Sequence, residues 1–122
     1  MLFMDIDKFK DINDTLGHKV GDLVLKEVSK RLKMILRESD TVARVGGDEF
    51  VVLLKYSNSN EEVEHVIKKI KDAIKAPLTV SKETLHIKIS IGYAFYPKDA
   101  QSVTELITMA DKKMFVEKFD RG

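Results

Sequence analysis

The sequence RVGGDEF at positions 44–50 constrains the fold of this chain more than any other stretch. The residues at 41–45 and 50–54 form short runs rich in β-branched and apolar side chains, which is typical of strands. The adjacent Gly46 and Gly47 can supply the positive φ angles that a tight hairpin turn needs. We therefore expect a β-hairpin with a glycine turn at its tip.

Acidic residues occur at the tip of this hairpin and after the first apolar run of the chain. Asp48 and Glu49 follow the glycines, and Asp5 directly follows the apolar residues 1–4, which read as a buried strand. If this strand lies beside the hairpin, the three carboxylates meet at one edge of the sheet. A divalent cation would relieve their mutual repulsion, so we expect the active site there. The ordinary reading of the hairpin acids is a solvated turn.

The rest of the chain alternates helical and strand patterns. Gly92 is expected to mark a bulge or a close approach of the backbone. The pattern predicts an α/β fold with a central mixed, mostly antiparallel sheet flanked by helices. The expected elements are a short helical stretch over 8–16, a helix over 19–38, a turn at 57–60 with a helix from a Ser59 cap to Pro77, strands at 78–80 and 85–91, and a helix after a Ser102 cap.

Length and composition limit the function. A chain of 122 residues with 43% hydrophobic content fits one globular domain. Its 21 basic and 20 acidic residues give a net charge of +1, which argues against a nucleic-acid partner bound mainly through phosphates. The sequence contains no cysteine and no segment expected to insert into a membrane, and the expected location is the cytoplasm.

Several ordered motifs resemble the diguanylate cyclase family, also called the GGDEF domain family. They are GGDEF at 46–50, DIDKFKDIND at 5–14 followed by Gly17-His18 and Gly21-Asp22, Ser90-Ile91-Gly92, and Ala110-Asp111 with Lys118. The resemblance implies one catalytic domain over 1–122 with a fold similar to the nucleotidyl cyclase and polymerase palm. The family's opening helix would precede Met1, and its usual Gly-Arg is reversed here as Arg121-Gly122.

The resemblance implies an enzyme that joins two GTP molecules into cyclic di-GMP and releases pyrophosphate. Such enzymes act as homodimers with Mg²⁺ or Mn²⁺, and sensory or receiver domains normally bring the two copies together. The metal would be held by Asp5, Asp48 and Glu49, with the Ile6 carbonyl as a fourth donor. Asp48 and Glu49 are the catalytic candidates, and either could take the proton of the attacking hydroxyl.

Further residues match the family's substrate contacts. Phosphate would be bound by Lys10, Lys118 and the backbone amides of Lys8 and Phe9. The ordinary alternatives are an exposed surface lysine for Lys10 and a lysine at a helix end for Lys118. Asn13 and Asp22 would recognise guanine. The ordinary alternatives are an Asx turn at Asn13 and a carboxylate in the first turn of a helix at Asp22. His18 would contact the sugar or shape the turn. The residues that bind substrate are therefore expected to be Phe9, Lys10, Asn13, His18, Asp22 and Lys118.

Arg37 and Asp40 match the spacing of the family's inhibitory motif. An arginine and an aspartate can bind guanine and phosphate groups, so this pair is the expected allosteric site for the product, cyclic di-GMP. A helix end followed by a polar loop is the ordinary alternative. Two other functions stay open: a domain that binds GTP or senses cyclic di-GMP without turnover, and an unrelated α/β interaction domain.

Overall fold

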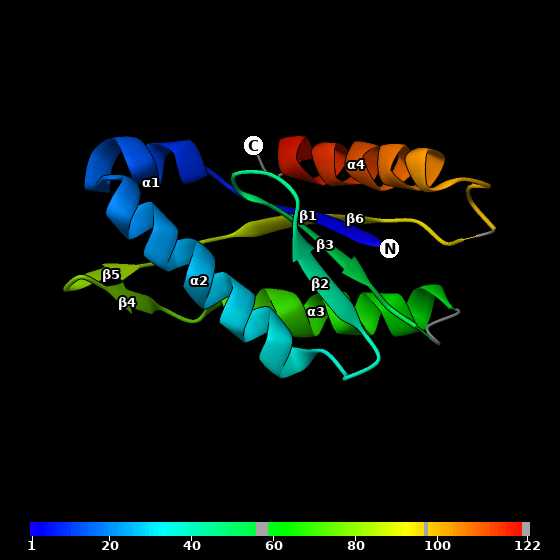
Figure 1. Cartoon of the computed structure of the whole chain (residues 1–122), viewed down its shortest axis with the longest axis horizontal. Helices are drawn as coiled ribbons and strands as arrows, with labels where there is room; N and C mark the ends of the chain where they lie inside the picture. Colours follow the sequence, from blue (N-terminus) through cyan, green and yellow to red (C-terminus); the bar gives the residue numbers. More distant parts are fainter. Residues whose placement is uncertain (56–58, 97, 121–122) are drawn as a thin grey trace.

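The computed structural model describes residues 1–55, 59–96 and 98–120 and contains six strands and four helices within these ranges (Figure 1). Their order is β1 (Leu2–Ile6), α1 (Phe9–Leu16), α2 (His18–Ile35), β2 (Thr41–Arg44), β3 (Glu49–Leu53), α3 (Asn60–Lys75), β4 (Leu78–Val80), β5 (Glu83–Leu85), β6 (Ile89–Tyr93) and α4 (Val103–Asp120). The predicted α/β class with a mostly antiparallel sheet is confirmed.

The main sheet has four strands in the order β2-β3-β1-β6, and neighbouring strands are antiparallel. Strand β1 lies inside the sheet, and all five of its residues are buried. A strand that is covered on both faces reads as a continuous apolar run, which explains the sequence pattern of residues 1–4. The predicted hairpin is formed by β2 and β3.

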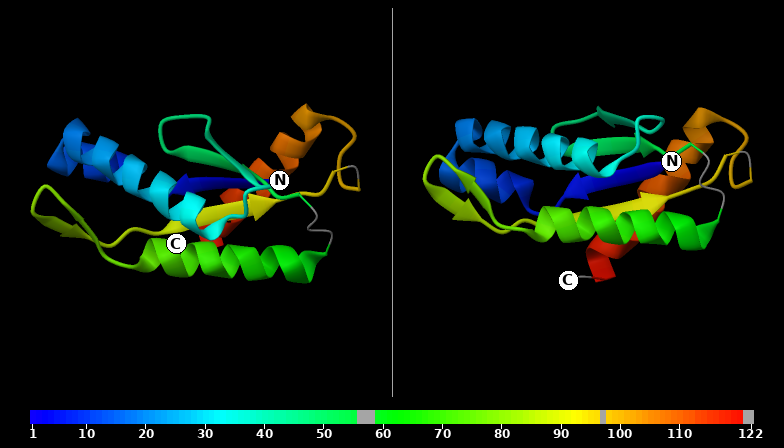
Figure 2. Two further views of the ribbon diagram at one scale, coloured as in Figure 1. Left: turned by 60° about the horizontal axis from the view of Figure 1, so that its bottom comes forward. Right: turned by 90° about the horizontal axis from the view of Figure 1, so that it is seen from below.

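Helices cover both faces of this sheet (Figure 2). On one face, α2 and α3 pack against Leu2, Met4 and Ile6 of β1 in the larger hydrophobic cluster. On the other face, α4 packs against Phe3 through Leu106, Ala110 and Met114. The alternation of side chains along β1 thus divides its residues between two cores.

Gly92 of β6 lies directly against the backbone of α4. A Cβ atom at this position would lie 2.1 Å from the Ala110 carbonyl oxygen and 2.2 Å from the Met114 amide nitrogen. The predicted close approach of the backbone is therefore present, and it allows α4 to lie flat across β1 and β6.

Three local expectations were wrong. The strand expected over 85–91 is divided into β5, which pairs only with β4 in a separate ribbon, and β6, which joins the main sheet. The long helix ends at Ile35 rather than near Glu38, because Leu36 is extended. Gly46 and Gly47 do not have positive φ angles, since the only glycine with one in the described chain is Gly17.

The hairpin turn explains the last of these differences. The Val45 amide donates to the Glu49 carbonyl at 3.0 Å, and the Arg44 guanidinium donates to the Gly47 carbonyl at 3.2 Å. This wider loop needs no left-handed residue. The Ser59 cap of α3 is present, with the Glu62 amide donating to its hydroxyl, whereas residues 57 and 58 of the expected turn lie outside the described residues.

Candidate active site

The register of the sheet brings the acids of two distant segments together. Asp5 of β1 lies directly opposite Glu49 of β3, and the Ile6 amide donates to the Asp48 carbonyl at 3.2 Å. Asp5 is buried, with 8% of its surface exposed, while Asp48 and Glu49 are half-buried. The structure thus places Asp5, Ile6, Asp48 and Glu49 at one end of the β1–β3 pair.

The Asp5 carboxylate has one charged partner in the described chain. Its Oδ2 atom accepts from the Lys118 ammonium of α4 at 2.8 Å, whereas its Oδ1 atom is buried and has no hydrogen-bond partner among the described residues. Burial and the nearby Asp48 carboxyl raise the pKa of Asp5 to about 6, and Lys118 opposes this rise. A buried oxygen without a partner is costly, so this atom is available to a ligand.

The two residues that face Asp5 also have shifted pKa values. Burial raises the pKa of Glu49, and the negative charges of Asp5 and Asp111 add to the rise. The hydrogen bond to Asp5 raises the pKa of Lys118. The site therefore carries excess negative charge that a single ammonium compensates only partly.

These oxygen donors are of the kind that a hard divalent cation prefers. Within the described ranges, no three acidic or histidine side chains stand close enough together to hold a metal by themselves. Mg²⁺, however, is usually bound through one or two carboxylates together with substrate phosphates and water. Asp5 with its open Oδ1 atom and Glu49 beside it provide such a pair.

The start of α1 offers donors for an anion next to the acids. Lys8 has left-handed backbone angles, with φ 57° and ψ 30°, and its side chain does not cap the helix. This conformation is costly for a residue with a side chain, and it turns the chain sharply from β1 into α1. Uncapped amides at a helix start attract negative charge. Lys10, in the first turn of α1, is exposed.

The predicted guanine-reading residues lie where α1 and α2 contact each other. The side-chain oxygen of Asn13 covers Gly21, where a Cβ atom would lie 1.8 Å from it, and the Phe9 ring lies beside the same glycine. Asp22 lines a cavity of about 340 Å³ together with Leu25, Lys26, Ser29 and Arg44. Asn13 thus contacts the residue before Asp22 but does not line the cavity that Asp22 lines, and His18 is exposed at the start of α2.

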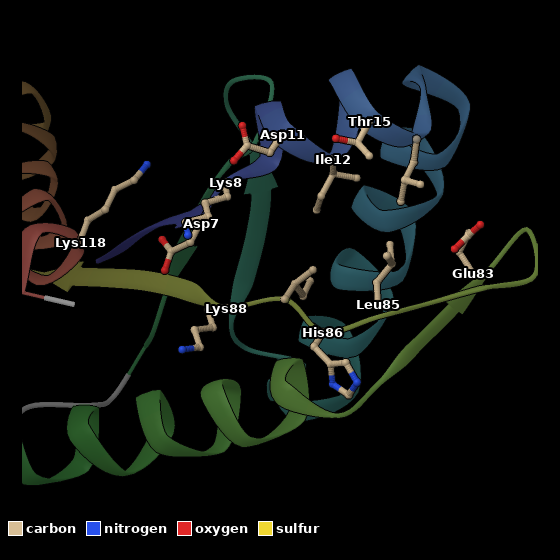
Figure 3. Close-up of a pocket in the computed structure, with 12 residues that line it drawn as sticks. Asp7, Lys8, Asp11, Ile12, Thr15, Glu83, Leu85, His86, Lys88 and Lys118 are labelled. Atoms are coloured by element: carbon tan, nitrogen blue, oxygen red, sulfur yellow. The ribbon is translucent and has the colours of Figure 1, made fainter. Parts of the chain in front are cut away.

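A larger cavity of about 670 Å³, shown in Figure 3, is not lined by Asp5, Asp48 or Glu49. It runs from Lys118 along α1 to the ribbon of β4 and β5. Of the predicted site residues, Lys118 and Lys8 line it, and Asp7 lies at the same end. Pocket shape alone would therefore have missed the acidic cluster.

Arg37 and Asp40 lie together in the loop between α2 and β2. The Arg37 Nε atom lies 3.3 Å from Asp40 Oδ2, and both residues line a cavity of about 190 Å³. The Asp40 carboxylate also accepts from the Arg37 and Lys55 amides, at 3.0 and 3.3 Å. Asp40 is therefore a structural residue of this loop, whatever else it binds.

Three residues next to the site, Asp7, Ser90 and Glu117, have contacts that the sequence did not predict. The buried Ser90 hydroxyl donates to Asp7 at 2.6 Å, and Glu117 bonds both to the Ile91 amide and to Lys71. Asp7 is visible in the sequence as the second acid of the DID motif at residues 5–7, but the sequence assigns it no role. The burial of Ser90 could not be predicted, because apolar and polar residues alternate over 85–91 and this pattern predicts an exposed side chain at position 90.

Known proteins resemble this chain over nearly its whole length. The model of the family described as "Diguanylate cyclase, GGDEF domain" matches residues 1–121. The bifunctional diguanylate cyclase/cyclic di-GMP phosphodiesterase MucR of Pseudomonas aeruginosa is 42% identical over 122 residues, all of this chain and 18% of MucR. The cyclic di-GMP phosphodiesterase NbdA of the same species is 40% identical over 111 residues, 90% of this chain and 14% of NbdA. The chain thus spans less than a fifth of the length of these relatives.

Solved structures agree with the sequence comparison. The GGDEF domain of TpbB from P. aeruginosa is 42% identical and superposes with a TM-score of 0.94 over 98% of this chain and 74% of that chain. The GGDEF domain of DgcB from Caulobacter crescentus, solved in complex with c-di-GMP, is 27% identical with a TM-score of 0.87 over 98% and 71%. No helix among the described residues has the length and apolar character needed to cross a membrane. The chain belongs to the diguanylate cyclase GGDEF-domain family.

Proposed function

We propose that this chain is the catalytic domain of a diguanylate cyclase, which converts two GTP molecules into cyclic di-GMP and two pyrophosphates. The observation that carries the proposal is the pairing of Asp5 with Glu49 on adjacent strands, beside an uncapped helix start and Lys118. Carboxylates, amides and an ammonium around one point form a site for a metal-bound triphosphate. Because GTP and Mg²⁺ are abundant in the cytoplasm, we place the reaction there.

Each half of the reaction makes one bond and breaks one. The 3′-oxygen of one GTP bonds to the α-phosphorus of the other, and the bond from that phosphorus to the bridging oxygen breaks, so its electron pair leaves with pyrophosphate. The proton of the hydroxyl passes to Glu49 or Asp48. The second half repeats this step with the roles of the nucleotides exchanged, which closes the ring.

The residues of this chain position the nucleotide for that step. Asp5, Glu49, Asp48 and the Ile6 carbonyl would hold Mg²⁺ or Mn²⁺, which supplies positive charge to the triphosphate and lowers the pKa of the attacking hydroxyl. The α1 amides near Phe9, together with Lys10 and Lys118, would bind the terminal phosphates. Asn13 and Asp22 would bind guanine at the α1–α2 contact, with His18 near the sugar.

Two further features belong to this proposal. One domain holds one GTP, so two chains must face each other, and domains outside this chain would bring them together. Cyclic di-GMP would bind at Arg37 and Asp40 and inhibit the enzyme. Support for this site comes from the exposed Arg37 side chain beside the 190 Å³ cavity.

The test is to incubate concentrated protein with GTP and Mg²⁺ and to separate the nucleotides. We expect cyclic di-GMP from the wild type and at least a hundredfold less from Glu49→Gln, because one charged donor is lost at the reacting phosphates. Glu61→Gln, on the exposed first turn of α3, is the matched control and should keep full activity. Equal product from wild type and Glu49→Gln would contradict the proposal.

A domain that binds nucleotide without turnover is the second candidate. The observation in its favour is the 40% identity to NbdA, whose name gives only the phosphodiesterase activity. In that case the wild type would bind GTP but form no cyclic di-GMP at any protein concentration. The intact pairing of Asp5 with Glu49 favours the cyclase.

A further inference from the structure

The last turns of α4 are tied to the edge of the sheet and to α3 by one residue, Glu117. Its Oε2 atom accepts from the Ile91 amide at 3.0 Å, and its Oε1 atom pairs with the Lys71 ammonium of α3. β6 is an edge strand of the main sheet, so its outward amide needs a partner from another element. Glu117 provides that partner and fixes the helix at this point.

The next residue, Lys118, reaches over β1 to the buried Asp5. Its ammonium lies 2.8 Å from Asp5 Oδ2, and 40% of its side-chain surface is exposed, against 11% for Asp5. Lys118 is the more exposed partner and can turn toward solvent, whereas Asp5 lies in the buried strand β1. The anchor at Glu117 keeps the ammonium within reach in both positions.

The Lys118 ammonium occupies Oδ2 of Asp5, so a divalent cation at the open Oδ1 would share one carboxylate with it. Asp5, Asp48 and Glu49 supply at most three negative charges, and placing both cations on Asp5 would bring like charges together. Phosphates of a bound nucleotide offer Lys118 another anionic partner at the same place. The ion pair between Lys118 and Asp5 is therefore favourable when the site is empty. It is unfavourable when a divalent cation and a nucleotide are bound.

We propose that Lys118 is a displaceable counter-ion of Asp5, held in reach by Glu117, which a divalent cation and nucleotide phosphates displace together. This inference rests on the proposed function, because it takes Asp5 as a metal ligand. The consequence is that cation and nucleotide binding are coupled. A cation at Oδ1 binds weakly by itself, because the ammonium on Oδ2 repels it, and nucleotide strengthens its binding by giving Lys118 a new partner.

The test measures Mn²⁺ binding by electron paramagnetic resonance, with and without a GTP analogue that carries an α,β-methylene bridge. Lys118→Met should bind Mn²⁺ alone about three- to tenfold more tightly than the wild type, the size expected for losing a partly exposed ion pair. The same variant should bind the analogue with Mn²⁺ more weakly. If Lys118 had only a structural role, its substitution would not tighten the binding of Mn²⁺ alone while weakening the binding of the analogue.

Three controls sharpen the result. Lys118→Arg keeps the charge and should behave like the wild type with Mn²⁺ alone. Lys112→Met removes an exposed lysine from the same helix and should change neither affinity. Glu117→Ala should tighten binding of Mn²⁺ alone, as Lys118→Met does, whereas Glu117→Gln keeps an acceptor for the Ile91 amide and should restore wild-type binding.

Asp5→Asn separates failure of this inference from failure of the proposed function. If Asp5→Asn abolishes Mn²⁺ binding while Lys118→Met leaves the affinity for Mn²⁺ alone unchanged or weaker, the counter-ion role is overturned and the metal site stands. If Asp5→Asn binds Mn²⁺ like the wild type, the metal assignment is wrong, and the counter-ion role falls with it.

Discussion

At the scale of single residues, the ionisation of Asp5 reduces the stability of the fold. Its pKa rises from 3.8 to about 6 on folding, because of burial and the nearby Asp48 carboxyl. The folded protein therefore binds the proton more tightly than the unfolded chain does. Stability from this group is greatest below pH 4 and is lost as the pH rises through 6.

Asp5→Asn should therefore stabilise the metal-free protein at high pH. We expect a gain on the order of 2 kcal/mol at pH 8, shrinking to near zero below pH 4, in urea unfolding with EDTA present. Asp14→Asn, on the exposed side of α1, is the control and should show no such dependence. A gain for Asp5→Asn that is the same at pH 4 and pH 8 would contradict the raised pKa.

Gly21→Ala tests the placement of Asn13. The new Cβ would lie 1.8 Å from the Asn13 side-chain oxygen, so that flexible side chain must move aside. We expect GTP affinity to fall about tenfold, as for Asn13→Ala, while the melting temperature changes by only a few degrees. Unchanged GTP affinity in Gly21→Ala would show that the position of Asn13 does not matter for binding.

What the sequence could predict at this scale depended on the type of residue. Acids that follow an apolar strand or a glycine pair are hard to explain by packing, so Asp5 and Glu49 could be recognised. The partners of these acids could not, because Lys118 and Asp5 are far apart in sequence and meet only through the packing of α4. Buried Ser90 was missed because β6 is covered on both faces.

At the scale of elements, the contact of α4 with β6 depends on Gly92. Gly92→Ala would push a Cβ into helix backbone, which cannot give way like a side chain. We expect a loss of more than 2 kcal/mol in unfolding free energy. Gly47→Ala is the matched control, since open space surrounds that position and its φ is not positive, and it should cost about 1 kcal/mol or less. Equal losses would contradict the close packing of α4.

The loop between α2 and β2 gives a second prediction for an element. Asp40→Ala would leave the Arg37 and Lys55 amides without their acceptor, so we expect a loss of about 1–2 kcal/mol in thermal or urea unfolding. Arg37→Ala keeps both amide bonds and should cost less than half as much. Inhibition by product is therefore best tested with Arg37→Ala, and equal stability of Asp40→Ala and wild type would argue against this loop structure.

The elements themselves were largely predictable, because helical and alternating apolar patterns mark each face that packs. The exception is the stretch 85–91, where one alternating pattern covers two strands. Alternation reports which side chains are buried and not which strand is the partner. The break at His86–Lys88 follows from pairing: β5 joins β4, while the Lys88 carbonyl accepts from the Asp7 amide beside β1.

At the scale of the whole molecule, the account depends on residues far apart in sequence meeting at one end of the sheet. β1 supplies Asp5, the hairpin supplies Glu49, and α4 supplies Lys118 from the other face. Antiparallel pairing of β1 with β3 is what brings the acids together. Every proposed step of the reaction uses this meeting point.

The most direct measurement is Mn²⁺ binding in the presence of the α,β-methylene GTP analogue, compared among wild type, Asp5→Asn, Glu49→Gln and the double variant. We predict that each single substitution weakens binding at least tenfold and that the double variant loses much less than the sum of the two, because both side chains hold the same ion. If either single variant binds Mn²⁺ like the wild type, or if the two losses simply add, Asp5 and Glu49 do not share a cation.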